Sequence, residues 1–346
     1  MKYFFFILII AIAAACQQST TEQAKSMTVQ EYFAPHDSGV QTAGIKMIAV
    51  ETPVGKFNVW TKTIGNNPRI KVLLLHGGPA ATHEYMECFE SFFPREGFEI
   101  IEYDQLGSVY SDQPKDSSLW TTGRFVEEVE QVRKTLGLNK DNFYLLGNSW
   151  GGILAMEYAL KYQDNIKGLL ICNMMASAHD YAKYAEDVLA KQMDPKILDT
   201  VRAIEAKGDY SNPKYMELLM PNFYHQHLCR LAEWPEPLNR SFAHINNEIY
   251  TMMQGPSEFG ISGRLANWDI KTRLKEIKVP TLTVGAKFDT MDPEHMKWMS
   301  TQVQNGSYLY CPEGSHLAMW DDQKHFYPGI IKFIKDVDGG TFKKGE

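Results

Sequence analysis

Short apolar runs recur along the chain, and most of them end at polar or glycine-rich positions. Runs of this kind are typical of strands that are buried on both faces of a parallel sheet. The strands predicted in this way are residues 71–75, 98–103, 143–146, 166–172, 279–285 and 307–310. Amphipathic stretches predict helices at residues 125–136, 153–162 and 326–335. Strands that alternate with helices indicate an α/β fold with a mostly parallel central sheet and helices on both faces.

Two segments depart from this alternation. Residues 46–51 and 56–62 flank the turn signal Pro53-Val54-Gly55, so we expect a hairpin before the parallel strands. Residues 178–265 are polar, helix-like and rich in aromatic side chains, and they show no strand pattern. We interpret them as an inserted helical cap. The predicted core is then residues 28–177 together with residues 266–346.

The first sixteen residues have the pattern of a targeting signal. Lys2 precedes an apolar run over residues 3–12, and small alanines lead to Cys16. The run is shorter than the roughly 20 residues that a membrane-spanning helix needs. The segment resembles a bacterial lipoprotein signal, with Ala13 where leucine is usual, and residues 17–27 would form a polar tether. This implies an exported protein that is anchored to a membrane through a lipidated Cys16. An ordinary cleaved signal and a cytoplasmic protein are the alternatives.

Charge and cysteine spacing argue against several classes of function. The formal net charge is −7, and no run of Lys and Arg supplies the basic patch that nucleic-acid binding requires. The five cysteines show no metal-ligand spacing, so we expect neither a structural metal nor a disulfide framework. The glycine motifs lack the lysine of a phosphate-binding loop and the spacing of a dinucleotide site. No cofactor is therefore predicted.

The segment from Gly147 to Gly151 matches the pattern G-x-S-x-G, which places Ser149 at its centre. It follows an apolar strand and precedes a helix, which is the context of a nucleophile elbow in an α/β-hydrolase fold. Ser149 is therefore the predicted nucleophile. The alternative is a glycine-rich turn with a structural serine.

A serine nucleophile needs a base and an acid that orients the base. In this fold they follow the serine in the order acid, then histidine. His316 lies just after the strand at 307–310, and Asp289 lies after the strand at 279–285, so both reach the same sheet edge. Asp292 is the competing acid, but it precedes Pro293 and has the pattern of a helix N-cap.

Two backbone N–H groups are predicted to stabilise the negative charge that develops on a substrate oxygen. The first belongs to Trp150, the residue after the nucleophile, and the second belongs to Gly78 in the loop after the strand at 71–75. The glycines and Pro79 also fit a turn that ends a strand, and both descriptions can hold at once.

Several motifs together resemble the proline iminopeptidases, close to the tricorn-interacting aminopeptidases of archaea. The motifs are His76-Gly77-Gly78-Pro79, Asp104-Gln105-Leu106-Gly107-Ser108, Gly147 to Gly152, Tyr224-His225-Gln226-His227-Leu228, Glu233-Trp234-Pro235 and Gly255-Pro256-Ser257-Glu258-Phe259. The resemblance implies an enzyme that removes an N-terminal residue, preferably proline, from short peptides. It also implies that Glu258 is the cap acid that holds the amino group of the substrate, whereas without the resemblance Glu258 would be read as a surface charge. Tyr250 is a candidate lining residue, although ordinary packing explains it equally well.

The chain departs from the family pattern at three positions. Thr290 stands where a second acid usually follows the acid of the triad, and Leu106 and Tyr110 stand where arginines are usual. The missing acid keeps open an amidase or esterase that acts on amino-acid amides or small acyl compounds. A non-catalytic binder on the same fold is a third hypothesis, which the complete set of Ser149, Asp289 and His316 disfavours.

Overall fold

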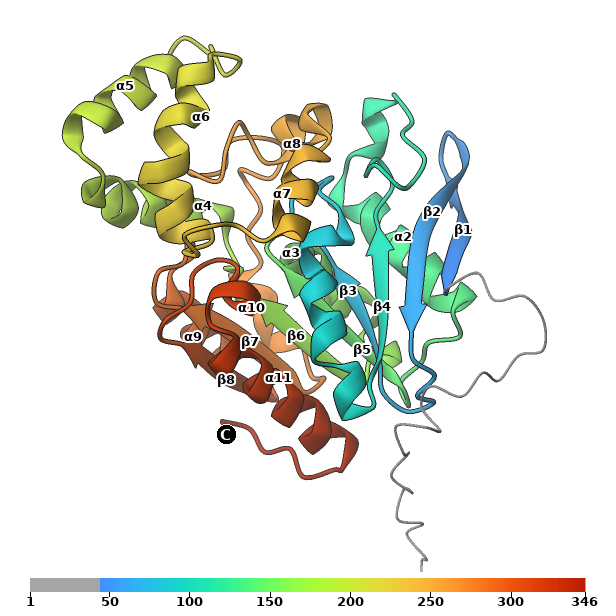
Figure 1. Cartoon of the computed structure of the whole chain (residues 1–346). Helices are drawn as coiled ribbons and strands as arrows, with labels where there is room; N and C mark the ends of the chain where they lie inside the picture. The colour runs from blue at the N-terminus through green and yellow to red at the C-terminus, as the bar shows by residue number, and fades with distance from the viewer. Residues whose placement is uncertain (1–43, 346) are drawn as a thin grey trace, which may run out of the picture.

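The computed structural model describes residues 44–345, and an eight-stranded sheet forms the centre of this part of the chain (Figure 1). The strand order is β1-β2-β4-β3-β5-β6-β7-β8. The strands are β1 Ile45–Thr52, β2 Gly55–Ile64, β3 Lys71–Leu75, β4 Glu99–Asp104, β5 Phe143–Asn148, β6 Gly168–Cys172, β7 Thr281–Ala286 and β8 Gly306–Cys311. Strands β1 and β2 form the predicted antiparallel hairpin, and β2 also pairs antiparallel with β4. The remaining pairs are parallel, which confirms the mostly parallel sheet.

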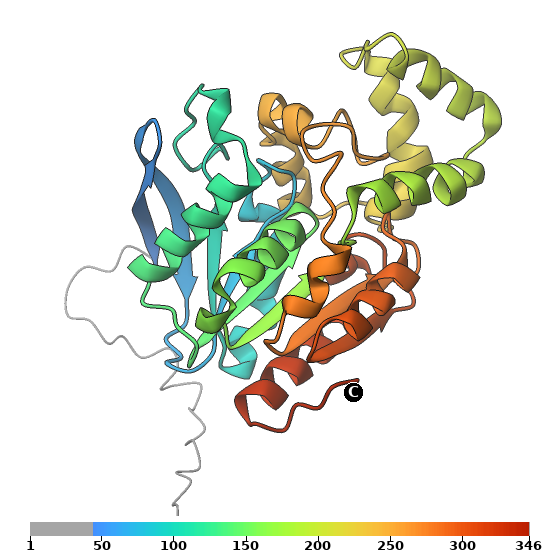
Figure 2. The ribbon, with the colours of Figure 1, turned by 180° about the vertical axis from the view of Figure 1, so that it is seen from behind.

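Helices cover both faces of the sheet, and the side chains of the strands alternate between two apolar layers. Leu73 and Leu145 belong to the layer beneath α2 Thr122–Thr135, α3 Trp150–Tyr162 and α9 Pro293–Gln302, which face the viewer in Figure 2. Leu74 and Leu146 belong to the opposite layer, beneath the 3-10 helix His83–Ser91, α10 Ala318–Asp321 and α11 Gln323–Asp338. This explains the continuous apolar runs, because a strand buried on both faces has no polar side.

The structure places the helices of the core slightly differently from the sequence prediction. Helix α2 begins at Thr122 instead of residue 125, because the side chain of Thr121 accepts a bond from the N–H of Arg124 and caps a polar first turn. Helix α3 begins at Trp150, directly after Ser149. Hydrophobic periodicity does not report such polar or glycine-rich first turns.

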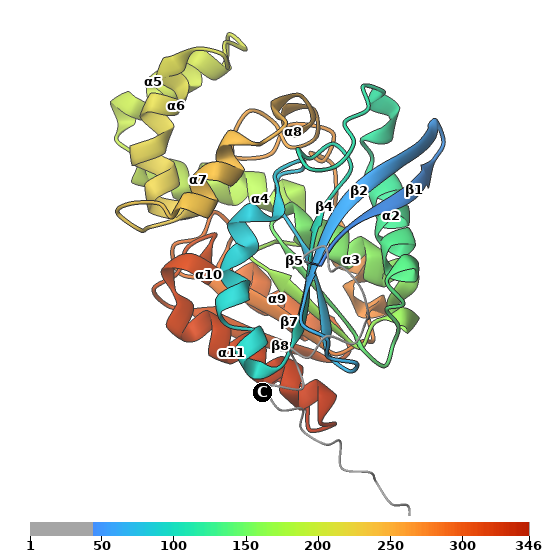
Figure 3. The same ribbon diagram turned by 45° about the vertical axis from the view of Figure 1, so that its right-hand side comes forward.

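Five α-helices lie between β6 and β7 and stand over one edge of the sheet (Figures 1 and 3). They are α4 Ala178–Tyr184, α5 Pro195–Glu205, α6 Pro213–Leu219, α7 Glu236–Ala243 and α8 Asn247–Met253. Figure 3 shows α5 and α6 projecting away from the sheet as an arm. The predicted cap covers the same stretch of chain, and its limits at residues 178 and 265 stay a prediction. The signal and tether, and residues 28–43 of the predicted core, lie outside the described residues.

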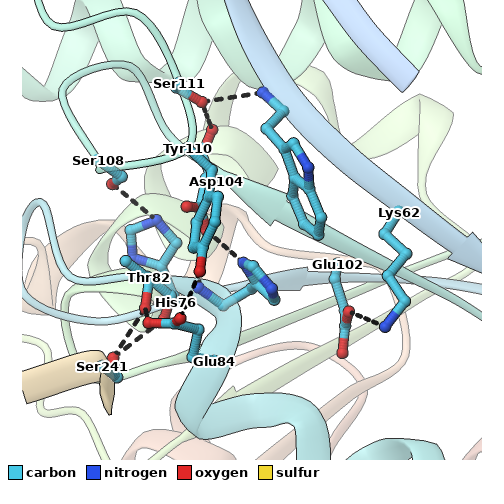
Figure 4. Close-up of polar contacts among 12 residues, drawn as sticks. Lys62, His76, Thr82, Glu84, Glu102, Asp104, Ser108, Tyr110, Ser111 and Ser241 are labelled. Atoms are coloured by element: carbon cyan, nitrogen blue, oxygen red, sulfur yellow. Dashed lines mark hydrogen bonds and ion pairs between the residues drawn. The ribbon is translucent and has the colours of Figure 1, made fainter. Parts of the chain in front are cut away.

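One buried carboxylate ties helix α7 to the core. Glu84 accepts hydrogen bonds from the hydroxyls of Thr82 and Tyr110, each at 2.7 Å (Figure 4). It also accepts one from Nη1 of Arg240 at 3.1 Å. The Nδ1 atom of His244 lies 2.8 Å from the same carboxylate. Burial alone would raise the pKa of Glu84, but the bonds from Tyr110, Thr82 and His244 outweigh it and lower the pKa.

We expect Glu84→Ala to lower the free energy of unfolding by roughly 2–4 kcal/mol, because it leaves several buried donors without an acceptor. Glu236 is the matched control, since it also pairs with Arg240 but is largely exposed. Glu236→Ala should cost less than about 1 kcal/mol. Urea unfolding of both variants measures the difference, and equal losses would contradict the assignment of Glu84 as the main tie.

Candidate active site

Ser149 occupies a strained turn between β5 and α3. Its backbone has φ 57° and ψ −125°, a conformation that non-glycine residues seldom adopt. The neighbouring glycines make the turn possible. A Cβ atom on Gly147 would lie 2.0 Å from the carbonyl oxygen of Gly151, and one on Gly151 would lie 2.0 Å from the carbonyl oxygen of Leu75. The turn is therefore the elbow that the sequence pattern predicts.

Asp289 and His316 meet at the same edge of the sheet, on the loops after β7 and β8. Oδ1 of Asp289 lies 2.8 Å from Nδ1 of His316, and both side chains are buried. Burial alone would lower the pKa of His316, but the Asp289 carboxylate and its hydrogen bond outweigh it, and the pKa is raised. Asp289 can thus hold the imidazole in one orientation and stabilise its protonated form.

Ser149 and His316 line one cavity but are not hydrogen-bonded to each other among residues 44–345. The Nε2 atom of His316 is buried and has no partner in this part of the chain. With Nδ1 facing Asp289, Nε2 is the atom that remains to accept a proton from the serine hydroxyl. Such bonds are often long in the absence of substrate and tighten when it binds.

Asp292 and Thr290, which lie close after Asp289 in the chain, make different contacts. Asp292 caps helix α9, with Oδ1 accepting from the N–H of Glu294 at 3.0 Å, as its sequence context predicts. The hydroxyl of Thr290 lies 3.0 Å from Nδ1 of His316 and 3.4 Å from Oδ1 of Asp289. Thr290 therefore binds the acid–histidine pair.

The loop after β3 brings Gly78 to the serine. A Cβ on its neighbour Gly77 would lie 3.0 Å from Cβ of Ser149, so the two backbones are close. The N–H of Gly77 already donates to the hydroxyl of Tyr85 at 2.7 Å. Neither Gly78 nor Trp150 donates its backbone N–H to another group within residues 44–345. These are the two N–H groups that the sequence predicts for an oxyanion site.

A buried polar network supports this loop, and Figure 4 shows the part of it that joins His76 to Ser108. Nε2 of His76 lies 3.1 Å from the backbone N–H nitrogen of Gln105 and 3.3 Å from the hydroxyl of Ser108. The side chain of Gln105 donates to the carbonyl of His76 at 3.1 Å and accepts from the indole of Trp150 at 2.7 Å. Gln105 thus joins the loop after β3 to the residue that follows the serine.

Leu106 and Tyr110, which stand where the family usually has arginines, lie near this network. Leu106 is fully buried, and its N–H donates to the carboxylate of Glu128 at 2.9 Å. Tyr110 is partly exposed and binds Glu84. Neither residue lines the cavity that contains Ser149.

The wall of the cavity at the serine is mainly apolar. The apolar side chains from the cap and from the loop after β8 are Leu228, Leu238, Phe242, Ile245 and Leu317. Glu258 and Tyr250 also line it, and the Tyr250 hydroxyl donates to Oε1 of Glu258 at 2.6 Å. Burial raises the pKa of Glu258, while His316 and Tyr250 act in the opposite direction. A carboxylate in an apolar cavity is suited to bind an ammonium group.

Asn173 is a site residue that the sequence argument missed. It has φ 55° directly after β6, and its Nδ2 donates to Oδ2 of Asp289 at 2.7 Å and to the carbonyl of Ser315 at 3.3 Å. A polar residue at the end of a parallel strand was the available signal. Tyr85, which joins Gly77 to the side chain of Asn148, carried no such signal.

Within residues 44–345, no group of three or more His, Cys, Asp or Glu side chains is placed to hold a metal ion. In the same range, none of the helices has both the length and the apolar character needed to cross a membrane.

Comparison with known proteins gives concordant matches. Residues 71–323 match the α/β-hydrolase fold family. A protein from Flavobacterium johnsoniae named proline iminopeptidase is 72% identical over 84% of this chain and 98% of its own length. One of the same name from Elizabethkingia meningoseptica is 69% identical over 86% of this chain and its full length. The solved structure of proline iminopeptidase from Mycobacterium smegmatis aligns with a TM-score of 0.76 and 27% identity, over 86% of this chain and 99% of that one.

Asn173 provides a test of the acid–histidine pair. Asn173→Gly removes the bond to Asp289 but keeps the left-handed backbone conformation, and we expect roughly a tenfold loss of kcat/KM. Asn173→Asp has the same shape but places a second carboxylate against Asp289, which should raise the pKa of the carboxylate pair. We expect kcat/KM of this variant to be roughly tenfold lower than that of Asn173→Gly. Hydrolysis of a short acyl ester measures both variants. A fully active Asn173→Asp would rule out this support of Asp289.

Proposed function

Because this chain belongs to the proline iminopeptidase family of α/β-hydrolases, we propose that it is a serine aminopeptidase that releases N-terminal proline or another small residue from short peptides. The observation that carries the proposal is the buried carboxylate of Glu258 in the apolar cavity that also contains Ser149 and His316. An apolar wall suits the ring of proline, and a carboxylate suits its charged nitrogen.

The proposed reaction begins when the hydroxyl of Ser149 attacks the carbonyl carbon of the first residue and gives its proton to Nε2 of His316. Asp289 stabilises the imidazolium. The N–H groups of Gly78 and Trp150 stabilise the oxyanion of the tetrahedral intermediate, a contribution worth about 10²–10³ in rate for one donor. His316 then protonates the leaving amine, and the acyl group stays on Ser149. Water, activated by the same histidine, hydrolyses the ester and regenerates the serine.

The names of the relatives favour the aminopeptidase over the amidase or esterase alternative. Thr290 carries no charge and contacts His316, so the carboxylate among the polar groups that line the cavity is that of Glu258. The proposal therefore places the recognition of the amino group on Glu258. The third hypothesis, a non-catalytic binder, is disfavoured because Asp289 and His316 are paired beside the cavity that contains Ser149.

We expect hydrolysis of proline p-nitroanilide to be at least about 100-fold faster than hydrolysis of its N-acetylated analogue, since acetylation removes the charge that Glu258 would bind. Ser149→Ala should reduce both activities by at least about 10³-fold. Glu258→Gln should lower kcat/KM for the free amine by about 10- to 100-fold and leave a short acyl ester almost unaffected. An enzyme that prefers the acetylated substrate would be an amidase or esterase.

The pH dependence follows from the sign of the shift at His316. His316 acts as a base only when it is neutral, and its pKa is raised in the folded protein. As the pH falls through this raised value the imidazole takes up a proton, so kcat/KM should fall on the acid side of neutrality. We expect this fall in kcat/KM at acid pH, the acid limb of the profile, for both the short acyl ester and proline p-nitroanilide (the amide). A profile that stays flat down to about pH 5 would contradict the assignment of His316 as the base.

We also propose that the protein is exported and anchored to a membrane through Cys16. The support is the sequence of residues 1–16, with a charged start, an apolar run and small residues before the cysteine. Lipidation would supply the membrane affinity. The polar residues 17–27 would keep the enzyme away from the lipid surface.

Fractionation of cells that express the full chain tests the anchor. We expect the wild type in the membrane pellet and Cys16→Ala mainly in the soluble fraction, with unchanged kcat/KM for proline p-nitroanilide. Mass spectrometry of the N-terminal peptide should show an acylated cysteine. Soluble wild-type protein with an unmodified or removed Cys16 would support an ordinary cleaved signal or a cytoplasmic protein instead.

A further inference from the structure

Three tyrosine hydroxyls hold Glu258, and each comes from a different element above the sheet. Tyr181 in α4 donates to the carbonyl of Glu258 at 2.5 Å. Tyr224, in the π-helical segment Met220–Leu228, accepts from its N–H at 3.1 Å. Tyr250 in α8 donates to Oε1 at 2.6 Å. All three tyrosines are buried, so these bonds lie away from bulk water.

The three tyrosines bind different parts of Glu258. Tyr181 and Tyr224 bind the main chain of Glu258 and so fix where the residue lies. Tyr250 alone binds the carboxylate, and it does so through Oε1. No group within residues 44–345 donates a hydrogen bond to Oε2, and Glu258 lines the cavity with Ser149 and His316. The two carboxylate oxygens are therefore not equivalent.

From this asymmetry we propose that Tyr250 is a positioning residue for amine recognition: it binds Oε1 of Glu258 and leaves Oε2 to receive the substrate's ammonium group. This inference rests on the proposed aminopeptidase function and adds to it the residue that makes a single carboxylate sufficient. Tyr250 itself does not need to touch the substrate.

The electrostatic surroundings explain why such a residue is needed. Glu258 is buried, which raises its pKa, and Asp289 acts in the same direction. His316 and the hydroxyl of Tyr250 act in the opposite direction without outweighing burial, so the pKa of Glu258 is raised. Tyr181 and Tyr224 face the main chain and supply no charge. A neutral Glu258 would have no charge with which to bind an ammonium group, so the hydroxyl of Tyr250 favours the form that binds.

The variant that tests this is Tyr250→Phe, which keeps the ring in the wall of the cavity and removes only the hydroxyl. We expect kcat/KM for proline p-nitroanilide to fall by about 10- to 100-fold, while that for p-nitrophenyl acetate changes less than about threefold. The acid limb for the amide should move to higher pH, because loss of a donor to the carboxylate raises the pKa of Glu258. The acid limb for the ester should not move to higher pH.

Tyr181→Phe is the matched control, because it removes a buried hydroxyl that binds the carbonyl of the same residue. It should lower activity on the amide without moving the acid limb. A double-mutant cycle gives a second readout. In the background of Glu258→Gln, which has no charge to lose, Tyr250→Phe should cost less than about threefold on the amide. The circular dichroism spectrum and thermal melting curve of each variant show that it has folded.

The outcomes separate the inference from the proposed function. If the wild type does not prefer the free amine over its acetylated analogue, the aminopeptidase function itself fails. If the wild type does prefer it, but Tyr250→Phe leaves the amide acid limb in place or costs the same in the Glu258→Gln background, the positioning role of Tyr250 is overturned. A shift to higher pH for the amide alone, together with the non-additive cycle, supports it.

Discussion

The close approach of β3 and β5 at their carboxyl ends is the constraint on which the site depends. Leu75 pairs with Gly147 at this point, and the carbonyl of Leu75 lies where a side chain on Gly151 would have to stand. Only glycine fits at both positions, and the backbone of Ser149 is forced to a positive φ. A strained residue of this kind costs of order 1–3 kcal/mol, which the surrounding packing must offset. The fully buried parallel strands on either side provide that packing.

The same edge of the sheet determines where the other polar groups lie. The loops after β7 and β8 bring Asp289 and His316 together, and the turn after β6 adds Asn173 to the free side of the carboxylate. The cap also takes part, because the N–H groups of His316 and Leu317 donate to the carbonyls of His227 and Leu228 at 3.0 and 2.9 Å. The cap therefore fixes the backbone of the histidine as well as the wall of the cavity.

Much of this arrangement could be predicted from the sequence. Buried strands leave continuous apolar runs, and the elbow leaves a glycine pattern, so the order of the elements and the positions of Ser149, Asp289 and His316 followed from local signals. The contacts of Asn173, Tyr85 and Glu84 could not be predicted in the same way. Their partners lie tens of residues away in the sequence, and a single tyrosine or asparagine has no periodicity that would indicate what it binds.

Thr290 shows how the position of one residue limits the choice of side chain. Its hydroxyl lies within hydrogen-bonding distance of both Nδ1 of His316 and Oδ1 of Asp289. A carboxylate held in that place would face the negative charge of Asp289 at short range in a buried setting, and repulsion would raise the pKa of one of them. A neutral hydroxyl avoids this conflict and leaves the charge of Asp289 to act on His316. The negative charge that faces the cavity is then carried by Glu258, whose position is fixed by buried tyrosines.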